Sequence, residues 1–401
     1  MANTLNLGTD GNWAVKKDSL LGYNSENNNY KPLPFDFTRA SSATVVNKAG
    51  LIETVGSGEP RIDFKDDAKG ALLLEPSRTN LLQYSEDFTS TEWTKNSVST
   101  PIADSISPDG SLNGYSVTNN ATGTCILYDN EIGASLLDST FSVFFKYKDL
   151  QYVSLRIDSP TDTALFDILN GSIVGSDATI TPRIKNYGNG WYRCSITHDS
   201  LTAAGNAVIM WNESGVLNDN TMASTNVGYY IYGAQFEVGS YATSYIPTSG
   251  SAVTRVGESS SQTVPDGVIG QTEGVMLLDV GKYESIGSIS SAIIFISNAL
   301  GDKLGFAVSN TKLIRVRVNA VNEEIGGTQV ENSKTAIRYT SIGIDVFYNG
   351  VKQTLTTIGS EVFSLPTSVS VVVPNQTYGI KGLQLYNTAL TDQELIALTT
   401  I

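Results

Sequence analysis

Short stretches in which apolar and β-branched residues alternate with polar ones, or run together, recur between residues 82 and 247. Clusters of Gly, Asn and Asp separate these stretches, which is typical of β-strands joined by tight turns. Because several such strands follow one another at near-regular spacing, the pattern predicts an antiparallel sandwich of jelly-roll form. The predicted strands lie at 142–147, 152–157, 191–197, 207–211 and 227–238.

The same pattern resumes over residues 272–401 and predicts a second sandwich. A passage rich in Ser, Gly and Pro at 248–271 separates the two halves and is predicted to be a linker. Near the C-terminus, Thr391 and Glu394 have the spacing of a capping box, which predicts a short helix from about residue 392.

The N-terminal part has a different character. Residues 1–36 are polar apart from isolated aromatic residues and are predicted to form an arm that is ordered only by docking, with a floppy terminus as the alternative. Residues 37–81 mix charges with isolated large apolar residues and are predicted to form a junction that lies against the chain's own β-domains or a partner chain. The predicted fold class is all-β: two antiparallel β-sandwich (jelly-roll) domains preceded by an extended N-terminal arm and an irregular junction.

Composition narrows the partners and the environment. The net charge of -14, without any Lys/Arg cluster, argues against nucleic-acid binding and against anionic membranes. Neither an apolar leader nor an apolar run of about 20 residues is present, so no signal peptide and no membrane insertion are expected. The two cysteines, Cys125 and Cys194, lie in strand-like runs and are predicted to be buried free thiols.

No catalytic residues are predicted. The single histidine, His198, lies beside Asp199 without the nucleophile motif of a serine hydrolase and is interpreted as a solvated turn residue. Glu323 and Glu324 are interpreted as a hairpin tip rather than a glycosidase pair. Carboxylates that converge from distant parts of the sequence leave polysaccharide degradation open as an alternative.

No cofactor and no metal site is predicted, because one His and two scattered Cys do not make a transition-metal site. A structural calcium ion, which needs only oxygen ligands, is the alternative left open. The loop carboxylates that could serve it are Asp87, Asp104, Asp129 and Glu131.

Glycan binding needs aromatic faces for the C–H patches of sugars and polar groups for their hydroxyls. Trp211 is the most suggestive ring because Asn212 follows it near a strand end, although a core position is the favoured alternative. Trp191 alternates with core positions and is predicted to be structural. The candidate glycan-binding residues are Trp93, Tyr128, Tyr152, Trp211, Asn212 and Tyr230.

The arm and the junction are the candidate subunit or particle interface. Three arginines recur there among isolated hydrophobic residues, and the planar guanidinium favours bidentate interface pairs. The alternative is that this segment packs only on its own domain. The candidate interface residues are Trp13, Tyr23, Phe35, Phe37, Arg39, Arg61 and Arg78.

Three resemblances connect these patterns. TRASSAT, GLIE, EPRIDF and LLLEPSRTNL, in this order within residues 35–84, resemble a junction of tailed-phage virion proteins. NGWYRCSI and YYIYGAQFEVGSYATSYIPT, within 82–247, resemble carbohydrate-binding modules of the 4/9 type. DVFYNGVKQ and IKGLQLYNTALTDQELIAL, within 272–401, resemble a laminin-G or concanavalin-A-like jelly roll.

These resemblances imply a virion protein, assembled in the host cytoplasm. A head or tail fibre or a similar appendage is expected, attached to other virion proteins through its N-terminal part and presenting its β-domains to host glycans. They also imply a homotrimer. The alternatives are a polysaccharide-degrading tail enzyme and a purely structural capsid decoration protein.

Overall fold

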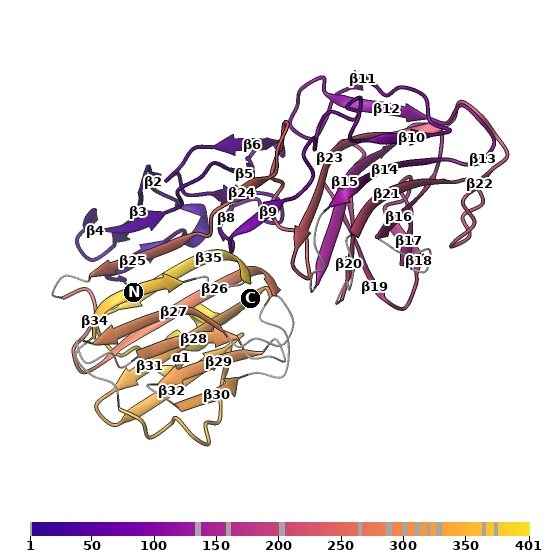
Figure 1. Cartoon of the computed structure of the whole chain (residues 1–401). Coiled ribbons are helices and arrows are strands. Elements are labelled where there is room, and N and C mark those ends of the chain that lie inside the picture. The colour runs from indigo at the N-terminus through magenta and orange to yellow at the C-terminus, as the bar shows by residue number, and fades with distance from the viewer. Residues whose placement is uncertain are drawn as a thin grey trace. The chain divides into compact units, whose positions relative to one another are not determined.

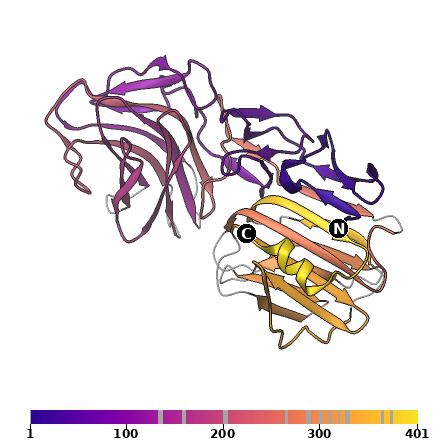
Figure 2. The same ribbon diagram turned by 180° about the vertical axis from the view of Figure 1, so that it is seen from behind.

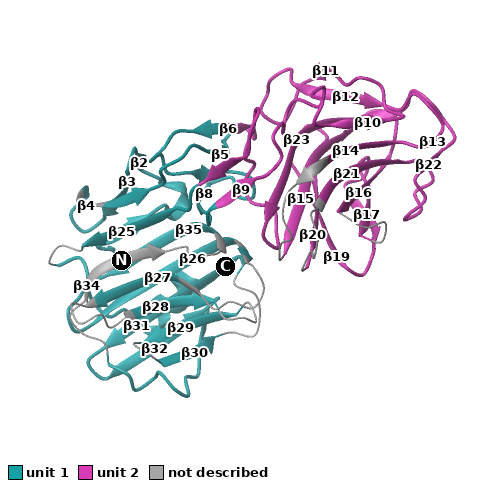
Figure 3. Cartoon of the chain, viewed as in Figure 1, with its two compact units in different colours: residues 1–48, 54–77, 256–401 teal, residues 49–53, 78–255 magenta. Residues whose placement is uncertain are grey.

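The computed structural model comprises two compact units, coloured separately in Figure 3. Unit 1 contains residues 1–48, 54–77 and 256–401, and unit 2 contains residues 49–53 and 78–255. Unit 2 is therefore inserted into the sequence of unit 1. The structure describes residues 2–132, 138–157, 162–199, 205–263, 267–285, 291–298, 303–308, 313–318, 321–325, 331–362, 366–372 and 376–401.

Unit 2 is a sandwich of two six-stranded antiparallel sheets (Figure 1). We call them the Tyr128 sheet and the Tyr230 sheet, after one residue in each. In order across the Tyr128 sheet, the strands are β10 (Thr94–Asn96), β14 (Ile126–Ile132), β21 (Gly205–Asn212), β16 (Tyr152–Ile157), β17 (Thr163–Asp167) and β18 (Ser172–Ser176). Those of the Tyr230 sheet are β11 (Ile102–Ser105), β12 (Gly114–Thr118), β23 (Gly228–Val238), β15 (Ser139–Tyr147), β20 (Trp191–His198) and β19 (Ile180–Asn186).

The core of unit 2 lies between these sheets and contains the alternate apolar side chains of both. Cys125 and Cys194 are buried there as free thiols, as predicted. Burial raises the pKa of both thiols, so both stay protonated at neutral pH. Trp191 is also buried and donates from Nε1 to the carbonyl of Ile106 at 2.9 Å, which confirms its structural role.

Two short strand pairs flank this sandwich. The strand β13 (Gly123–Thr124) pairs with β22 (Thr221–Met222). At the ends of the insertion, β9 (Arg78–Asn80) pairs with β24 (Val253–Arg255), so the segments that enter and leave unit 2 run side by side.

Unit 1 is built from 17 strands in two layers (Figures 1 and 2). One layer contains β35 (Gln376–Tyr386), β26 (Gly274–Ser285), β31 (Ser333–Thr340), β32 (Gly343–Tyr348) and β33 (Val351–Lys352), with β1 (Leu5–Leu7), β8 (Ala71–Leu74) and β7 (Ile62–Asp63). The other contains β34 (Pro366–Val372), β27 (Ser291–Asn298), β28 (Lys303–Val308), β29 (Ile314–Val318) and β30 (Val321–Ile325), with β25 (Ser259–Thr263), β4 (Asn29–Thr38), β3 (Ser19–Asn24) and β2 (Val15–Lys16). The described part of the chain is thus all-β, as predicted.

The one α-helix among the described residues is α1 (Asp392–Thr399), which Figure 2 shows against the outer side of the first layer. Thr391 accepts from the backbone N–H of Glu394, whose carboxylate accepts from the N–H of Thr391, so the predicted capping box is confirmed. The helix covers a small apolar cluster that includes Phe347 and Leu395. The short 3₁₀ turn η1 (Thr9–Gly11) and the hairpin of β5 (Ala43–Val46) and β6 (Ile52–Val55) complete the elements.

The predicted N-terminal arm is wrong. Strand β1 pairs with β35 at the opposite end of the sequence, in the register Leu5 with Leu385. Leu20 and Phe35 belong to the same buried core as the strands of residues 272–401. The physical reason is burial: the isolated apolar residues of 1–36 fill positions that the C-terminal strands leave open.

The junction and the linker also differ from the prediction, because both contain strands of unit 1 or segments that tie it together. Arg39 donates from Nη1 to Glu258 at 2.8 Å, and Arg61 donates from Nε to the same carboxylate at 2.8 Å. Arg61 also donates to Glu75 at 3.0 Å, and the side chains of all four residues are fully buried. Burial opposes the charge of Arg61, but the carboxylates of Glu258 and Glu75 outweigh it and raise the pKa of Arg61. We call this set the buried ion network.

Candidate functional site

The two tryptophans proposed to contact glycans lie in the core of unit 2. Trp211 is 0% exposed, donates from Nε1 to the carbonyl of Val227 at 3.2 Å and packs against Tyr229 at 4.9 Å between ring centroids. Trp93 is 1% exposed and donates to the carbonyl of Tyr84 at 2.8 Å. Neither ring has a face available to a sugar, so both are corrected to core residues.

The remaining candidates lie on two different surfaces. Tyr128, Tyr152 and Asn212 belong to strands of the Tyr128 sheet and alternate with core residues, which places them on the outer face of that sheet. Tyr230 occupies the corresponding position on the outer face of the Tyr230 sheet. The structure therefore brings together three of the six predicted residues.

A loop of residues 213–220 engages two of these three. The side chain of Asn212 accepts from the N–H of Gly215 at 2.9 Å and donates to the carbonyl of Val216 at 2.9 Å. Gly215 has a φ of 72° and approaches the ring of Tyr152 so closely that an added Cβ would lie 2.9 Å from it. Asn212 and Tyr152 therefore hold this loop against the sheet, which leaves Tyr128 as the candidate on this face that is not occupied in this way.

Tyr128 lies in a cross-strand row. Its Cα partner on β21 is Val208, whose partner on β16 is Arg156. Val208 is buried although it is not part of the sandwich core, so it forms an apolar floor on the outer face. Tyr128 and Arg156 are both half-buried and stand on either side of it, about 10 Å apart at two strand spacings. We call these three residues the Tyr128 row.

Arg156 was missed in the sequence, where it reads as a polar interruption of the strand YVSLRI. Its Nε is buried and has no hydrogen-bond partner in the described structure. Burial lowers the pKa of Arg156, with no charged neighbour as a counteracting cause. A charged residue on the period-2 outer face of a strand, two positions from Ser154, was the signal that could have revealed it.

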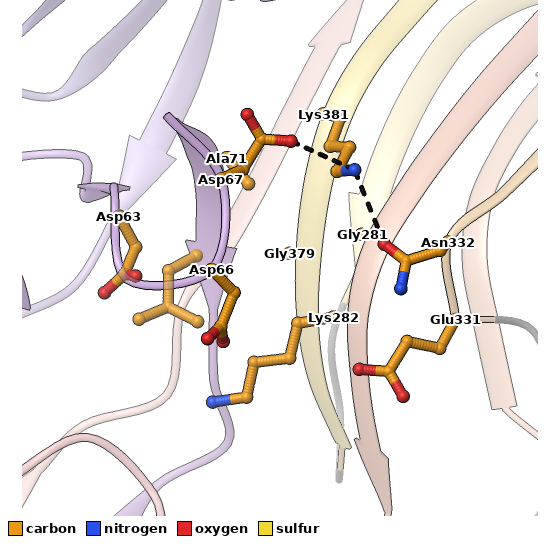
Figure 4. A pocket seen from close by; sticks show the side chains of 11 residues that line it. Asp63, Asp66, Asp67, Ala71, Gly281, Lys282, Glu331, Asn332, Gly379 and Lys381 are labelled. Carbon is orange, nitrogen blue, oxygen red and sulfur yellow. Dashed lines mark hydrogen bonds and ion pairs between the residues drawn. The ribbon is translucent and has the colours of Figure 1, made fainter. Parts of the chain in front are cut away.

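Unit 1 contains a polar pocket of about 80 Å³, shown in Figure 4. The Nζ of Lys381 lies 3.0 Å from Asp67 and 3.4 Å from the Oδ1 of Asn332, and closes one side of it. Asp63 accepts the N–H groups of Val46 and Lys65, and its burial raises the pKa of its carboxyl. The volume corresponds to two or three waters and is well below the roughly 300–1,000 Å³ of small-molecule sites. The pocket is therefore not a site for a sugar ring.

The interface candidates mostly lie inside their own units. Phe35 and Phe37 belong to the core of unit 1, and Arg39 and Arg61 belong to the buried ion network, so all four are corrected to internal residues. Within unit 2, Arg78 lies 3.8 Å from the buried Glu237 and over the ring of Tyr241.

Two aromatic candidates near the N-terminus remain. Trp13 packs against the core of unit 1 and donates to the carbonyl of Gly70 at 3.1 Å. Tyr23 is half-buried and lies edge-to-face with the exposed Tyr30, 5.1 Å between ring centroids, near the turn between β3 and β4. The Tyr23–Tyr30 pair is thus the part of the predicted interface that faces solvent.

Residues weighed for catalysis have structural partners. His198 lies with Nε2 3.5 Å from Asp162 at the end of β20. Glu323 and Glu324 lie within β30 rather than at a hairpin tip, and Glu323 accepts the backbone N–H groups of Thr356, Thr357 and Ile358. These hydrogen bonds outweigh the effect of burial and lower the pKa of Glu323, so its carboxylate is held in a structural role.

The loop carboxylates weighed for calcium lie apart from one another in function. Asp87 accepts from Thr89 at 2.9 Å and Asp104 from Ser116 at 3.0 Å, while Asp129 is buried and the side chain of Glu131 lies outside the described residues. Among the side chains that the structure describes, no group of three or more His, Cys, Asp or Glu could hold a metal ion. No described helix has the length and apolar character needed to cross a membrane.

Comparisons with known proteins give weak likenesses. No family model and no curated protein sequence matches the chain. The CBM40 domain of the Ruminococcus gnavus IT-sialidase bound to α2,3-sialyllactose is 17% identical with a TM-score of 0.27, over 33% of this chain and 84% of that chain. The Trypanosoma rangeli sialidase with 2,3-difluorosialic acid is 11% identical with a TM-score of 0.30, over 96% of this chain and 83% of that chain. Likenesses at this level carry no argument about function.

Proposed function

We propose that this chain is a non-enzymatic appendage protein of a tailed-phage virion and that it binds glycans through the outer face of the Tyr128 sheet. The observation that carries the binding role is the Tyr128 row: a partly exposed aromatic ring, an apolar floor and a cationic donor in one line across three strands. Aromatic faces and a few placed polar groups are the features that sugars need.

The Tyr128 row predicts a loss of binding on truncation of its ring. Tyr128→Ala is expected to weaken glycan binding about tenfold, because one stacked ring contributes roughly 1.4 kcal/mol. Tyr230→Ala is the matched control, since Tyr230 is also half-buried but lies on the opposite sheet. The measurement is an array of bacterial surface oligosaccharides, followed by calorimetry on the best ligand. Equal weakening by both variants, or by neither, would reject this face as the site.

The non-enzymatic role has its own test. The bound polysaccharide is incubated with the purified chain, and reducing ends are measured over time. A steady release of new ends would establish the polysaccharide-degrading alternative.

The virion role is supported by the resemblance of residues 35–84 to phage virion proteins. Arg39 of TRASSAT, Arg61 of EPRIDF and Glu75 of LLLEPSRTNL are members of the buried ion network. These motifs therefore specify a scaffold that carries an inserted domain, an arrangement suited to appendages with exchangeable binding modules. A homotrimer and attachment to other virion proteins belong to the same proposal.

The Tyr23–Tyr30 pair is the surface we assign to attachment, because the other interface candidates contact their own units. Tyr23→Ser with Tyr30→Ser is expected to leave the fold intact and to reduce incorporation into particles, measured by quantitative mass spectrometry of purified virions. Unchanged incorporation would reject this surface, and absence of the unaltered chain from particles would reject the virion role itself.

A further inference from the structure

Arg156 differs from the other buried arginines of the chain in having no acceptor. In the same unit, Arg193 donates to the carbonyl of Thr243 at 2.6 Å and to the hydroxyl of Ser142 at 2.9 Å. Arg61 of unit 1 has two carboxylates. No hydrogen bond or ion pair joins Arg156 to any residue that the structure describes, and its Nε is inaccessible to water.

Carboxylates near Arg156 in the sheet register are committed elsewhere. Asp177 accepts the N–H of Thr163 at 3.0 Å and the side-chain amide of Asn218 at 3.1 Å. Asp167 accepts from Gln151 at 2.9 Å and from the N–H and side chain of Asn170, and these bonds outweigh burial and lower the pKa of its carboxyl. The side chains of this face thus leave the guanidinium without a countercharge.

A guanidinium without acceptors is costly to bury, and a ligand that supplies them recovers that cost. Ser154, two positions earlier on the same face, likewise has a buried hydroxyl without a hydrogen-bond partner. The planar fork of arginine matches a carboxylate better than it matches neutral hydroxyls, because it offers two parallel N–H donors. The distance of about 10 Å between Tyr128 and Arg156 leaves room for one sugar ring on Val208.

Resting on the glycan-binding role proposed above, we propose that the Tyr128 row selects glycans with carboxylated sugars: Arg156 pairs with the carboxylate, and Tyr128 packs on the apolar face of the same ring. The net charge of -14 repels polyanions at long range. Selection therefore comes from the local contact, within the roughly 8 Å over which charges act at physiological salt.

The test uses the full chain and calorimetry at physiological salt. The probes are a uronic-acid trisaccharide, the same trisaccharide with its carboxyl groups reduced to alcohols, and a sialylated trisaccharide. We expect at least one of the two acidic probes to bind 30-fold or more tightly than the neutral probe, and the acidic probe that binds identifies the source of the carboxylate. Arg156→Gln is expected to abolish this preference, and Arg156→Lys to reduce it.

Arg183→Gln is the matched control, because Arg183 is a half-exposed arginine on β19 of the opposite sheet. If acidic and neutral probes bind equally while Tyr128→Ala still weakens both, carboxylate selection is rejected and the glycan-binding role stands. If neither these probes nor the oligosaccharide array binds, both proposals are rejected. The comparison of probes on the unaltered chain decides the question even if Arg156→Gln fails to fold.

Discussion

A chain that lacks residues 1–36 is expected to have an unfolded unit 1. The deletion removes β1 and β3, most of β4, and four apolar side chains from the core: Leu5, Leu7, Leu20 and Phe35. Truncation of one buried side chain of this kind costs about 2–5 kcal/mol, so the four together cost at least ~8 kcal/mol. This is comparable with the whole stability of a typical domain, about 5–15 kcal/mol.

Hydrogen exchange resolved by mass spectrometry can follow the two units separately. In the truncated chain, amides of β26 and β35 should lose protection while those of β15 and β23 in unit 2 keep it. Leu20→Ala, at a buried position of β3, should destabilise unit 1 by about 2–5 kcal/mol. Val15→Ala, on the exposed β2, should change it by less than about 0.5 kcal/mol. Full protection of β26 and β35 in the truncated chain would show that 1–36 is a dispensable arm after all.

Arg61→Met is expected to destabilise unit 1 by about 3–5 kcal/mol, because it removes one of two cations that balance two buried carboxylates. Methionine preserves most of the apolar stem, so the loss measures the charge and its hydrogen bonds. The carbonyl of Thr44, which accepts from Arg61 at 2.9 Å, also loses its donor. Denaturant-dependent exchange of the β26 and β35 amides gives the free energy of unfolding.

A second substitution separates charge balance from packing. Arg61→Met combined with Glu75→Met leaves Arg39 with Glu258, a neutral pair, and is expected to recover about 1–3 kcal/mol of the loss. Arg315→Met is the control, since the pair of Arg315 and Glu324 is partly exposed and is worth less than about 1 kcal/mol. Equal losses for Arg61→Met and Arg315→Met would mean that the buried network contributes no more than a surface ion pair.

The features that the sequence predicted well are local ones. Alternation of apolar residues revealed the strands at 142–147, 191–197 and 227–238, because period 2 is a property of neighbouring positions. The capping box of Thr391 and Glu394 lies within four consecutive residues and was confirmed. The all-β class follows from these signals together.

The features that escaped prediction depend on distant partners. Nothing in LNL indicates that Leu5 pairs with Leu385, and nothing in TRASS indicates that Arg39 meets Glu258. Isolated apolar residues and arginines look alike whether they face a partner chain or the chain's own distant strands. The arm, the junction and the linker were therefore separated from a domain to which much of their length belongs.

The candidate site shows the same division. Alternation correctly separated Tyr128 from the core, whereas Trp211 was singled out for its ring and its neighbour Asn212, both of which have internal roles. Arg156 became visible only when the strand register placed it across Val208 from Tyr128. A site made by three strands that are not consecutive in the sequence cannot be read from any one of them.

The insertion of unit 2 also sets an order of events during synthesis. Residues 78–255 form an almost continuous stretch, so unit 2 can fold while the ribosome is still adding the remaining chain. Strand β1 is made first, yet its partner β35 is among the last segments to leave the ribosome. The apolar residues of the N-terminal strands thus wait without their partners until translation is nearly complete, which makes them the segment most in need of chaperone protection.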